Sequence, residues 1–155
     1  MHIRTLTAWP TLPRTMATAL ICLLVWAQHA AASTHEASIE RDHYGVPHIY
    51  GETDADAAFG LAYAQAEDAW PIMEGSLPFF RGTAGLYEGQ EGAQSDYLVK
   101  WLDLWGALDR DYERVLSPEI RRYVEAFAEG FNAFTRDNPS EVQHPELLPI
   151  TGKDI

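Results

Sequence analysis

The chain has 155 residues, enough for one domain or for part of a larger one. Its formal net charge is −12, which argues against binding to nucleic acid or to an anionic membrane surface, since both partners are themselves negative. We interpret the charge as the solvated acidic surface of an exported protein, in preference to an acidic face that receives a cationic partner.

Residues 1–32 have the pattern of a secretory signal peptide. Arg4 and Arg14 provide the positive start, residues 16–27 form an apolar stretch, and alanines suited to signal peptidase follow. The apolar stretch is shorter than the roughly 20 residues that a membrane-spanning helix needs. We therefore expect a cleaved signal, no membrane contact afterwards, and a secreted or periplasmic mature chain of residues 33–155.

Cleavage would remove Cys22, the only cysteine, so the mature chain would have neither a disulfide nor a thiol nucleophile. It would also place Ser33 at the N-terminus, where a free α-amino group can act as a base toward the hydroxyl. We reject Ser33 as a catalytic residue, because small residues ordinarily follow a signal peptide and no rigid element holds this one.

Two short strands are predicted at residues 39–42 and 46–50, joined by a tight reversal. The second strand alternates its side chains between two faces, and Gly45 in the reversal can adopt the positive φ that a tight turn needs. Pro47 has no amide hydrogen to donate, so this strand should lie at a sheet edge or a bulge. We assign a structural role to the motif at this reversal, which consists of Tyr44, Gly45, Val46, Pro47 and His48.

A helix should follow, with Thr53 as its N-cap and acidic residues in its first turn. One apolar stripe repeats at steps of three and four residues, and small residues beside it would let another backbone approach. Pro71 should kink this helix, because its ring clashes with the carbonyl of Glu67. The stripe consists of Phe59, Ala62, Tyr63, Ala66, Trp70 and Met73.

Glycines interrupt the sequence after Pro71, which predicts a broken helix to about Phe80 and then a loop with a short turn. Aromatic residues are frequent around this loop, and packing explains them better than the lining of a pocket. The large apolar side chains in question are Phe79, Phe80, Leu86 and Tyr87.

Two more helices are predicted to begin at the caps Ser95 and Ser117. The first should run for five turns with Trp101 and Trp105 on its apolar stripe, where their four-residue spacing favours the core over a ligand platform. Gly130 lies inside the last helix at a propensity cost of about 1 kcal/mol, which is tolerable if another backbone crosses there.

The chain after the last helix is expected to form an extended, proline-rich connection over residues 140–149. Residues 151–155 then have the pattern of a helix cap followed by the first apolar residue of another helix. On this interpretation the chain stops as an element begins.

No metal site or catalytic group is recognisable in the mature chain. Its histidines lack the spacing of a metal-binding helix, and we expect His43 and His48 to share a structural role across the hairpin. Pairs of acidic residues occur at helix ends or on polar faces, where solvent and helix dipoles explain them better than acid–base catalysis. These pairs are Asp54/Asp56, Glu67/Asp68 and Asp109/Asp111.

Four stretches of sequence carry a family resemblance. The first runs from Y-G-V-P-H-I-Y-G through D-A-x-x-A-F-G-L-A-Y-A-Q-A-E-D at residues 44–68. The others are R-G-T-A-G at 81–85, L-S-P-E-I-R-R-Y-V-E-A-F-A-E-G-F-N-A-F at 116–134, and L-P-I-T-G-K-D-I at 148–155. In this order they resemble the start of the α chain in the penicillin acylase family, which includes penicillin, cephalosporin and acyl-homoserine lactone acylases.

The resemblance implies an α+β protein: a mostly helical α-chain segment with an N-terminal β-hairpin, belonging to an αββα N-terminal-nucleophile hydrolase fold that an absent β chain completes. Members of the family are made as one precursor that cleaves itself, and the new N-terminal serine of the β chain attacks an amide carbonyl. The implied reaction is hydrolysis of an acyl amide to a carboxylic acid and an amine. The candidate small-molecule substrates are β-lactam amides and acyl-homoserine lactones.

The resemblance also implies that no catalytic residue lies in this chain and that the fragment alone is inactive, and it leaves the substrate-binding residues unknown. The expected partner is the β chain of the same precursor, in a heterodimer. No cofactor or metal is expected in the fragment, although calcium is possible in the full-length enzyme. The ending L-P-I-T-G-K-D is slightly closer to the cephalosporin acylases.

The sequence leaves one alternative open: a small, secreted, acidic binding protein that is complete as given and has no catalytic activity. The self-contained set of helices favours this alternative. The ordered motifs and the abrupt end favour a truncated acylase α chain.

Overall fold

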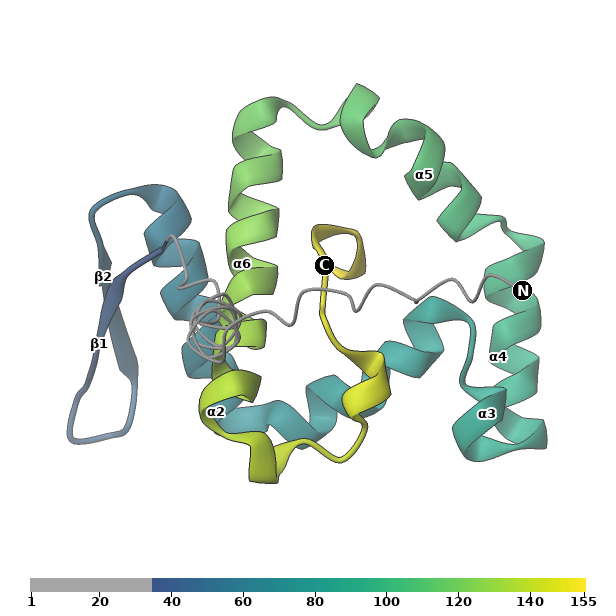
Figure 1. The fold of residues 1–155 in the computed structure, drawn as a ribbon, viewed down its shortest axis with the longest axis horizontal. Helices are drawn as coiled ribbons and strands as arrows, with labels where there is room; N and C mark the ends of the chain where they lie inside the picture. Colours follow the sequence, from purple (N-terminus) through teal and green to yellow (C-terminus); the bar gives the residue numbers. More distant parts are fainter. Residues whose placement is uncertain (1–34) are drawn as a thin grey trace, which may run out of the picture. The chain divides into compact units, whose positions relative to one another are not determined.

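A computed structural model describes residues 35–155 (Figure 1). The predicted signal peptide of residues 1–32 and the predicted new N-terminus at Ser33 lie outside the described residues. The strands and α-helices are β1 (Ala37–Arg41), β2 (Pro47–Gly51), α2 (Asp54–Arg81), α3 (Gly85–Glu88), α4 (Gln90–Trp101), α5 (Leu104–Val115) and α6 (Pro118–Asp137). Three 3-10 helices follow: η1 (Pro139–Glu141), η2 (Pro145–Leu147) and η3 (Gly152–Asp154).

Strands β1 and β2 pair antiparallel as the predicted hairpin, with Ala37 opposite Gly51 at its open end and Arg41 opposite Pro47 near its turn. Gly45 has a φ of +85°, so the expectation that this glycine supplies the reversal is confirmed. The carboxylate of Asp42 accepts the amides of residues 44 and 46 at 2.9 and 3.0 Å, which fixes the turn. Within the described residues this sheet has two strands.

Helix α2 begins and bends where the sequence predicts. Thr53 caps it, and the Thr53 and Asp56 side chains each accept the other residue's amide in a reciprocal capping box. Ala69 leaves helical geometry at φ −149° and ψ 25°, two residues before Pro71, so the predicted kink is confirmed. The second half of α2 ends at Gly82, whose φ of +67° suits a glycine cap.

Small residues let α2 contact two other elements closely. A Cβ on Gly60 would lie 2.6 Å from the Cβ of Ala37, so the hairpin rests directly on the backbone of α2. A Cβ on Gly130 of α6 would overlap the carbonyl oxygen of Phe59. The crossing backbone that the sequence requires at Gly130 is therefore the first half of α2.

The core lies between α2 and α6. Trp70 and Phe131 are its largest fully buried side chains, and the ring of Trp70 lies 5.8 Å, between centroids, from that of Phe134. Ser117 caps α6 by accepting the amide of Ile120 at 3.2 Å, as predicted. The buried members of the core are Ala62, Ala66, Trp70, Leu77, Ala128, Phe131, Phe134, Leu147 and Ile150.

The segment after α6 is not the extended connection that we expected. It forms η1 and η2 and folds back, seen in yellow in Figure 1, so that Leu147 and Ile150 enter the core. Glu74 of α2 is only 2% exposed and accepts the amides of Gln143 and His144, at 3.0 and 2.7 Å. The prediction failed because these contacts join residues about seventy positions apart, which local composition does not reveal.

The second predicted helix begins earlier than expected. It starts at Gln90, and the hydroxyl of Ser95 donates to a carbonyl one turn before it at 2.7 Å, so Ser95 is not the cap. Part of the predicted loop is the short helix α3. The carboxylate of Asp96 accepts the amides of Ala84 and Gly85 at 2.7 and 2.9 Å, which joins α3 to α4.

The predicted five-turn helix is also two helices, because Asp103 adopts a left-handed conformation with φ of +50° between α4 and α5. Trp101, which we placed in the core, is 69% exposed within the described residues. Trp105 is half-buried, and its Nε1 donates to the carbonyl of Phe80 at 3.0 Å. Helical spacing correctly identified an apolar face here, but it does not specify what covers that face.

Of the large apolar residues at the end of α2 and in α3, Tyr87 packs its ring against His144, at 4.9 Å between centroids, but the others do not pack as predicted. They are exposed among the described residues, with Leu86 at 82%. No helix in the described part of the chain is long and apolar enough to cross a membrane.

The close crossing at Gly130 generates a paired test. Gly130→Ala should destabilise the chain by about 1–3 kcal/mol, because the added methyl overlaps the carbonyl of Phe59. Gly75→Ala is the matched control, since a Cβ there has no atom within 4 Å and should add up to about 1 kcal/mol through helix propensity. Urea unfolding measures both, and equal effects would contradict the packing described here.

Candidate functional site

The hairpin motif is held against α2 by Arg41. Its guanidinium lies 2.9 Å from the carboxylate of Glu67 and 3.0 Å from that of Asp68, and it donates to the carbonyl of Gly45 at 3.0 Å. These contacts tie the turn at the start of the first resembling stretch to the part of α2 at its end. They support the structural role that the sequence assigned to this motif.

The two hairpin histidines do not share a site. The ring of His43 lies 3.7 Å, between centroids, from that of Tyr44. The Nε2 of His48 lies 3.7 Å from a carboxylate oxygen of Asp42. Tyr44 is exposed, so the motif forms a solvent-facing turn in the described residues and not the wall of a cavity.

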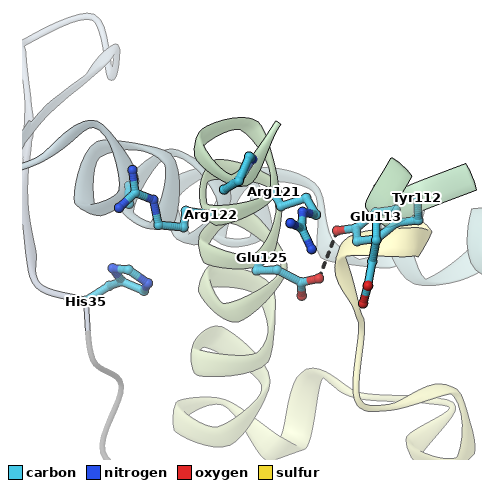
Figure 2. A pocket seen from close by; sticks show the side chains of 8 residues that line it. His35, Tyr112, Glu113, Arg121, Arg122 and Glu125 are labelled. Atoms are coloured by element: carbon cyan, nitrogen blue, oxygen red, sulfur yellow. Dashed lines mark hydrogen bonds between the residues drawn. The ribbon is translucent and has the colours of Figure 1, made fainter. Parts of the chain in front are cut away.

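A pocket of about 510 Å³ lies beside the first two turns of α6 (Figure 2). The hairpin side contributes His35, two residues before β1, and the other walls come from the start of α2, the end of α5 and α6 itself. Figure 2 shows Arg122 projecting toward His35 on one side of α6, and Arg121 projecting toward Tyr112 on the other. The lining residues are His35, Ala55, Tyr112, Glu113, Pro118, Arg121, Arg122 and Glu125.

Three elements meet at Glu125 on one side of this pocket. The hydroxyl of Tyr112 donates to one carboxylate oxygen at 2.8 Å, and the amide of Gly152 donates to the other at 3.1 Å. Burial, together with this bond to a carboxylate, raises the pKa of Tyr112 to about 12. The arrangement joins α5, α6 and η3, and it leaves Tyr112 a protonated donor at neutral pH.

On the other side of the pocket, His35 contacts the N-terminal turn of α2. Its Nδ1 lies 3.0 Å from the carboxylate of Asp56, the residue that completes the capping box with Thr53. The bond from Thr53 and the bond with His35 lower the pKa of Asp56. His35 thus joins the start of the hairpin to the start of the helix.

No nucleophile with an adjacent base is present among residues 35–155. The hydroxyls of Ser76 and Ser95 donate to carbonyls of their own helices, and Ser117 serves as a cap. The same residues contain no group of three His, Cys, Asp or Glu side chains that could hold a metal ion. The location of the nucleophile and any calcium site therefore stay predictions.

Sequence reasoning missed the contacts that fix the C-terminal segment. Arg81 donates to Asp154 at 2.7 Å and to the carbonyl of Leu147 at 2.7 Å. The side-chain amide of Asn132 donates to the carbonyl of Ile150 and accepts its amide, at 2.7 and 2.8 Å. Arg81 and Asn132 both lie in the stretches that carried the family resemblance. Their place in these stretches was the only signal in the sequence that could have pointed to these contacts.

Large apolar side chains without a partner in residues 35–155 lie on one side of α4 and just after its C-terminal end. They are exposed in a part of the chain that is otherwise strongly acidic. Exposed apolar surface of this extent is typical of a surface that binds another protein. We refer to these side chains as the α4 face, which consists of Tyr97, Leu98, Trp101, Leu102 and Leu104.

Comparison with known proteins identifies the family. The family model described as penicillin amidase matches residues 36–152 of the chain. The chain belongs to the penicillin amidase family. This confirms the resemblance that its motifs suggested.

Individual relatives agree with this assignment. The chain is 32% identical over 145 residues to an acyl-homoserine lactone acylase, PvdQ, of Pseudomonas savastanoi pv. phaseolicola, which covers 85% of this chain and 18% of the relative. It is 34% identical over 96 residues to the penicillin acylase 2 proenzyme of Pseudomonas sp. strain SE83, a match that covers 62% of this chain and 12% of the relative. It is 31% identical over 111 residues to the penicillin G acylase of Escherichia coli, a match that covers 70% of this chain and 13% of the relative.

The chain thus spans less than a fifth of the length of these relatives. A solved chain of a thermostable penicillin G acylase from Alcaligenes faecalis has the same fold, with a TM-score of 0.64 at 24% identity. That match covers 79% of this chain and 69% of the solved chain. The expected fold class, a mostly helical acylase segment with an N-terminal hairpin, is confirmed.

The raised pKa of Tyr112 generates a test by pH. An unfolded tyrosine loses its proton near pH 10, whereas Tyr112 holds its proton to about pH 12 in the folded chain. Its contribution to stability is therefore complete below pH 10 and is lost as the pH rises to about 12. Urea midpoints measured across this range should fall less steeply for Tyr112→Phe than for the parent chain.

Two further variants make that test specific. Tyr97→Phe removes the hydroxyl of an exposed tyrosine and is the matched control for loss of a hydroxyl. Tyr123→Phe measures the contribution of a second tyrosine to the alkaline decline. The hydrogen bond to Glu119, and to a smaller extent desolvation, raises the pKa of Tyr123 to about 12 as well. An identical alkaline decline in the parent chain and in Tyr112→Phe would contradict the role assigned to the Tyr112–Glu125 bond.

Proposed function

We propose that this chain is the N-terminal part of the α chain of an exported, self-processing amidohydrolase, which hydrolyses an acyl amide to a carboxylic acid and an amine. The observation that carries the proposal is the match of the penicillin amidase family model to residues 36–152. The relatives named above are acyl-homoserine lactone acylases and penicillin acylases. Both names denote removal of an acyl group, so we keep β-lactam amides and acyl-homoserine lactones as the two substrate classes.

The proposed chemistry requires a nucleophile with an adjacent base, and residues 35–155 do not contain such a pair. A serine hydroxyl at a new N-terminus attacks the amide carbonyl, its α-amino group takes the proton, and the amine leaves from the resulting tetrahedral intermediate. Water then releases the carboxylic acid from the acyl-enzyme. We place this nucleophile, and the donors that stabilise the oxyanion, on a second polypeptide of the same precursor.

A second polypeptide also gives the α4 face a function. Burying one large apolar side chain contributes about 1.5–3 kcal/mol, so covering Trp101 and its neighbours would contribute substantially to assembly. The two-stranded hairpin has the same requirement, because an isolated hairpin is marginal in water and a partner strand could extend it. One relative is a proenzyme, which is consistent with production as a precursor.

Export follows from the expected signal peptide and is part of the proposal. In that case the mature chain begins at or near Ser33 and is secreted or periplasmic. Calcium in the assembled enzyme is likewise a proposal, with ligands outside residues 35–155 or shared with the partner, since the described residues lack a three-ligand group.

Purification of this chain from its source cells through an affinity tag tests the proposal directly. We expect a second polypeptide to co-purify, N-terminal sequencing to begin at or near Ser33, and the complex to release acid from a phenylacetyl amide or a long-chain acyl-homoserine lactone. The isolated chain should show no turnover. Purification of the chain alone, without hydrolysis of either substrate, would favour the small secreted binding protein instead.

Substitutions on the α4 face test how the chain associates. Trp101→Ser should reduce the amount of co-purified polypeptide, because it removes an exposed apolar side chain and leaves the core unchanged. Glu91→Ser, at an exposed position of the same helix, is the matched control and should have little effect. The isolated chain should also bind a hydrophobic dye, and Trp101→Ser should bind less of it. Equal co-purification for both variants would exclude the α4 face as the contact.

A further inference from the structure

Two adjacent arginines lack the ion pairs that other basic side chains of the chain have. Residues 35–155 contain nine Lys and Arg against 23 Asp and Glu, and six of the nine form ion pairs within this part of the chain. Arg121 and Arg122 are among the three that do not, and both line the pocket of Figure 2. In so acidic a chain, two arginines that line one pocket and form no ion pair, although Glu113 and Glu125 also line it, require an explanation.

Arg121 is held in a costly position. Its Nε is buried and has no hydrogen-bond partner in the described residues. A buried donor without an acceptor is destabilising, and Arg has no neutral form that would relieve the cost. The position in the helix adds to this cost, because α6 begins only a few residues earlier and the start of a helix disfavours cations.

Glu125, four residues along the same helix from Arg121, bonds to other donors and forms no ion pair with Arg121. Both oxygens of Glu125 accept bonds, one from the hydroxyl of Tyr112 and one from the amide of Gly152. Glu113, on the wall opposite, is exposed to solvent and forms no ion pair with either arginine. The pocket therefore presents guanidinium donors that have no acceptor among residues 35–155.

We propose that this pocket is a carboxylate-binding site, with Arg121 as the hydrogen-bond donor and Arg122 as a second positive charge on its other side. A planar guanidinium with free N–H groups matches a carboxylate in geometry and charge. Phosphate fits less well, because Glu113 and Glu125 at the pocket and the acidic chain as a whole repel a dianion more strongly than a monoanion.

Two sources could supply this carboxylate. One is an Asp or Glu side chain of the partner polypeptide, which rests on the proposed function. The other is a free small acid. A tethered side chain has the advantage of a high effective concentration, whereas a free anion must approach a chain of net charge −12.

The experiment observes the arginine Nε–H resonances of the full chain by NMR. Two probes are titrated at constant ionic strength: sodium acetate, and the peptide acetyl-Gly-Glu-Gly-amide, whose single charge is a side-chain carboxylate. The Nε–H of Arg121 should shift and saturate with both, because either probe would bind the same guanidinium. The Nε–H of Arg136 is the internal control and should not move, because the guanidinium of Arg136 is already paired through Nη2 with Glu129 on the same helix.

Substitutions assign the effect. Arg121→Met should abolish saturable binding, Arg122→Met should weaken it severalfold, and Arg136→Met should leave it unchanged. In the absence of probe, Arg121→Met should also raise the urea midpoint, because it removes the unsatisfied donor. Arg121→Lys retains the charge without the planar group and should bind several times more weakly than the parent chain.

The outcomes decide whether the site exists and which source supplies the carboxylate. Stronger binding of the peptide than of acetate supports a polypeptide source, and equal binding supports a free acid. Failure of Arg121 to shift with either probe, or equal shifts of Arg121 and Arg136, would overturn the site. This result is independent of amide hydrolysis, so loss of the proposed function would not by itself remove the carboxylate site.

Discussion

The crossing of α2 over α6 at Gly130 is the constraint on which the rest of the structure depends. The absence of a side chain there lets the carbonyl of Phe59 approach the backbone of α6. This approach brings Trp70 into contact with Phe131 and Phe134 and closes the core. A helix residue that is unfavourable by propensity is thus retained because the packing that it permits outweighs its cost.

The kink of α2 divides the helix into two halves that contact different parts of the chain. The first half of the helix carries the hairpin, which rests on Gly60, and the second half carries the end of the described chain. That end is fixed by polar contacts with low exposure, from Glu74 and from Arg81 to Asp154. A single bent helix therefore holds both ends of the described segment, which is the property expected of a scaffold for a larger assembly.

Helices α4 and α5 contribute no buried residue to the core between α2 and α6. Helices α4 and α5 leave aromatic residues exposed, and Asp103 between them adopts a conformation that few residues other than glycine favour. The pocket beside α6 holds arginines without acceptors in the described residues. One surface is apolar, and the other carries two arginines that form no ion pair in the described residues. A partner that contacts both surfaces would have to match both, which favours a specific partner over general hydrophobic association.

The sequence by itself determined the features whose causes lie within a few residues. These include the caps at Thr53 and Ser117, the kink before Pro71 and the positive φ of Gly45, because each follows from local backbone chemistry. Motif order also determined the family. Only the tertiary structure decided that the segment after α6 enters the core and that Trp101 stays outside it. Those outcomes depend on contacts between distant residues and on which faces find a partner, and helical periodicity specifies neither.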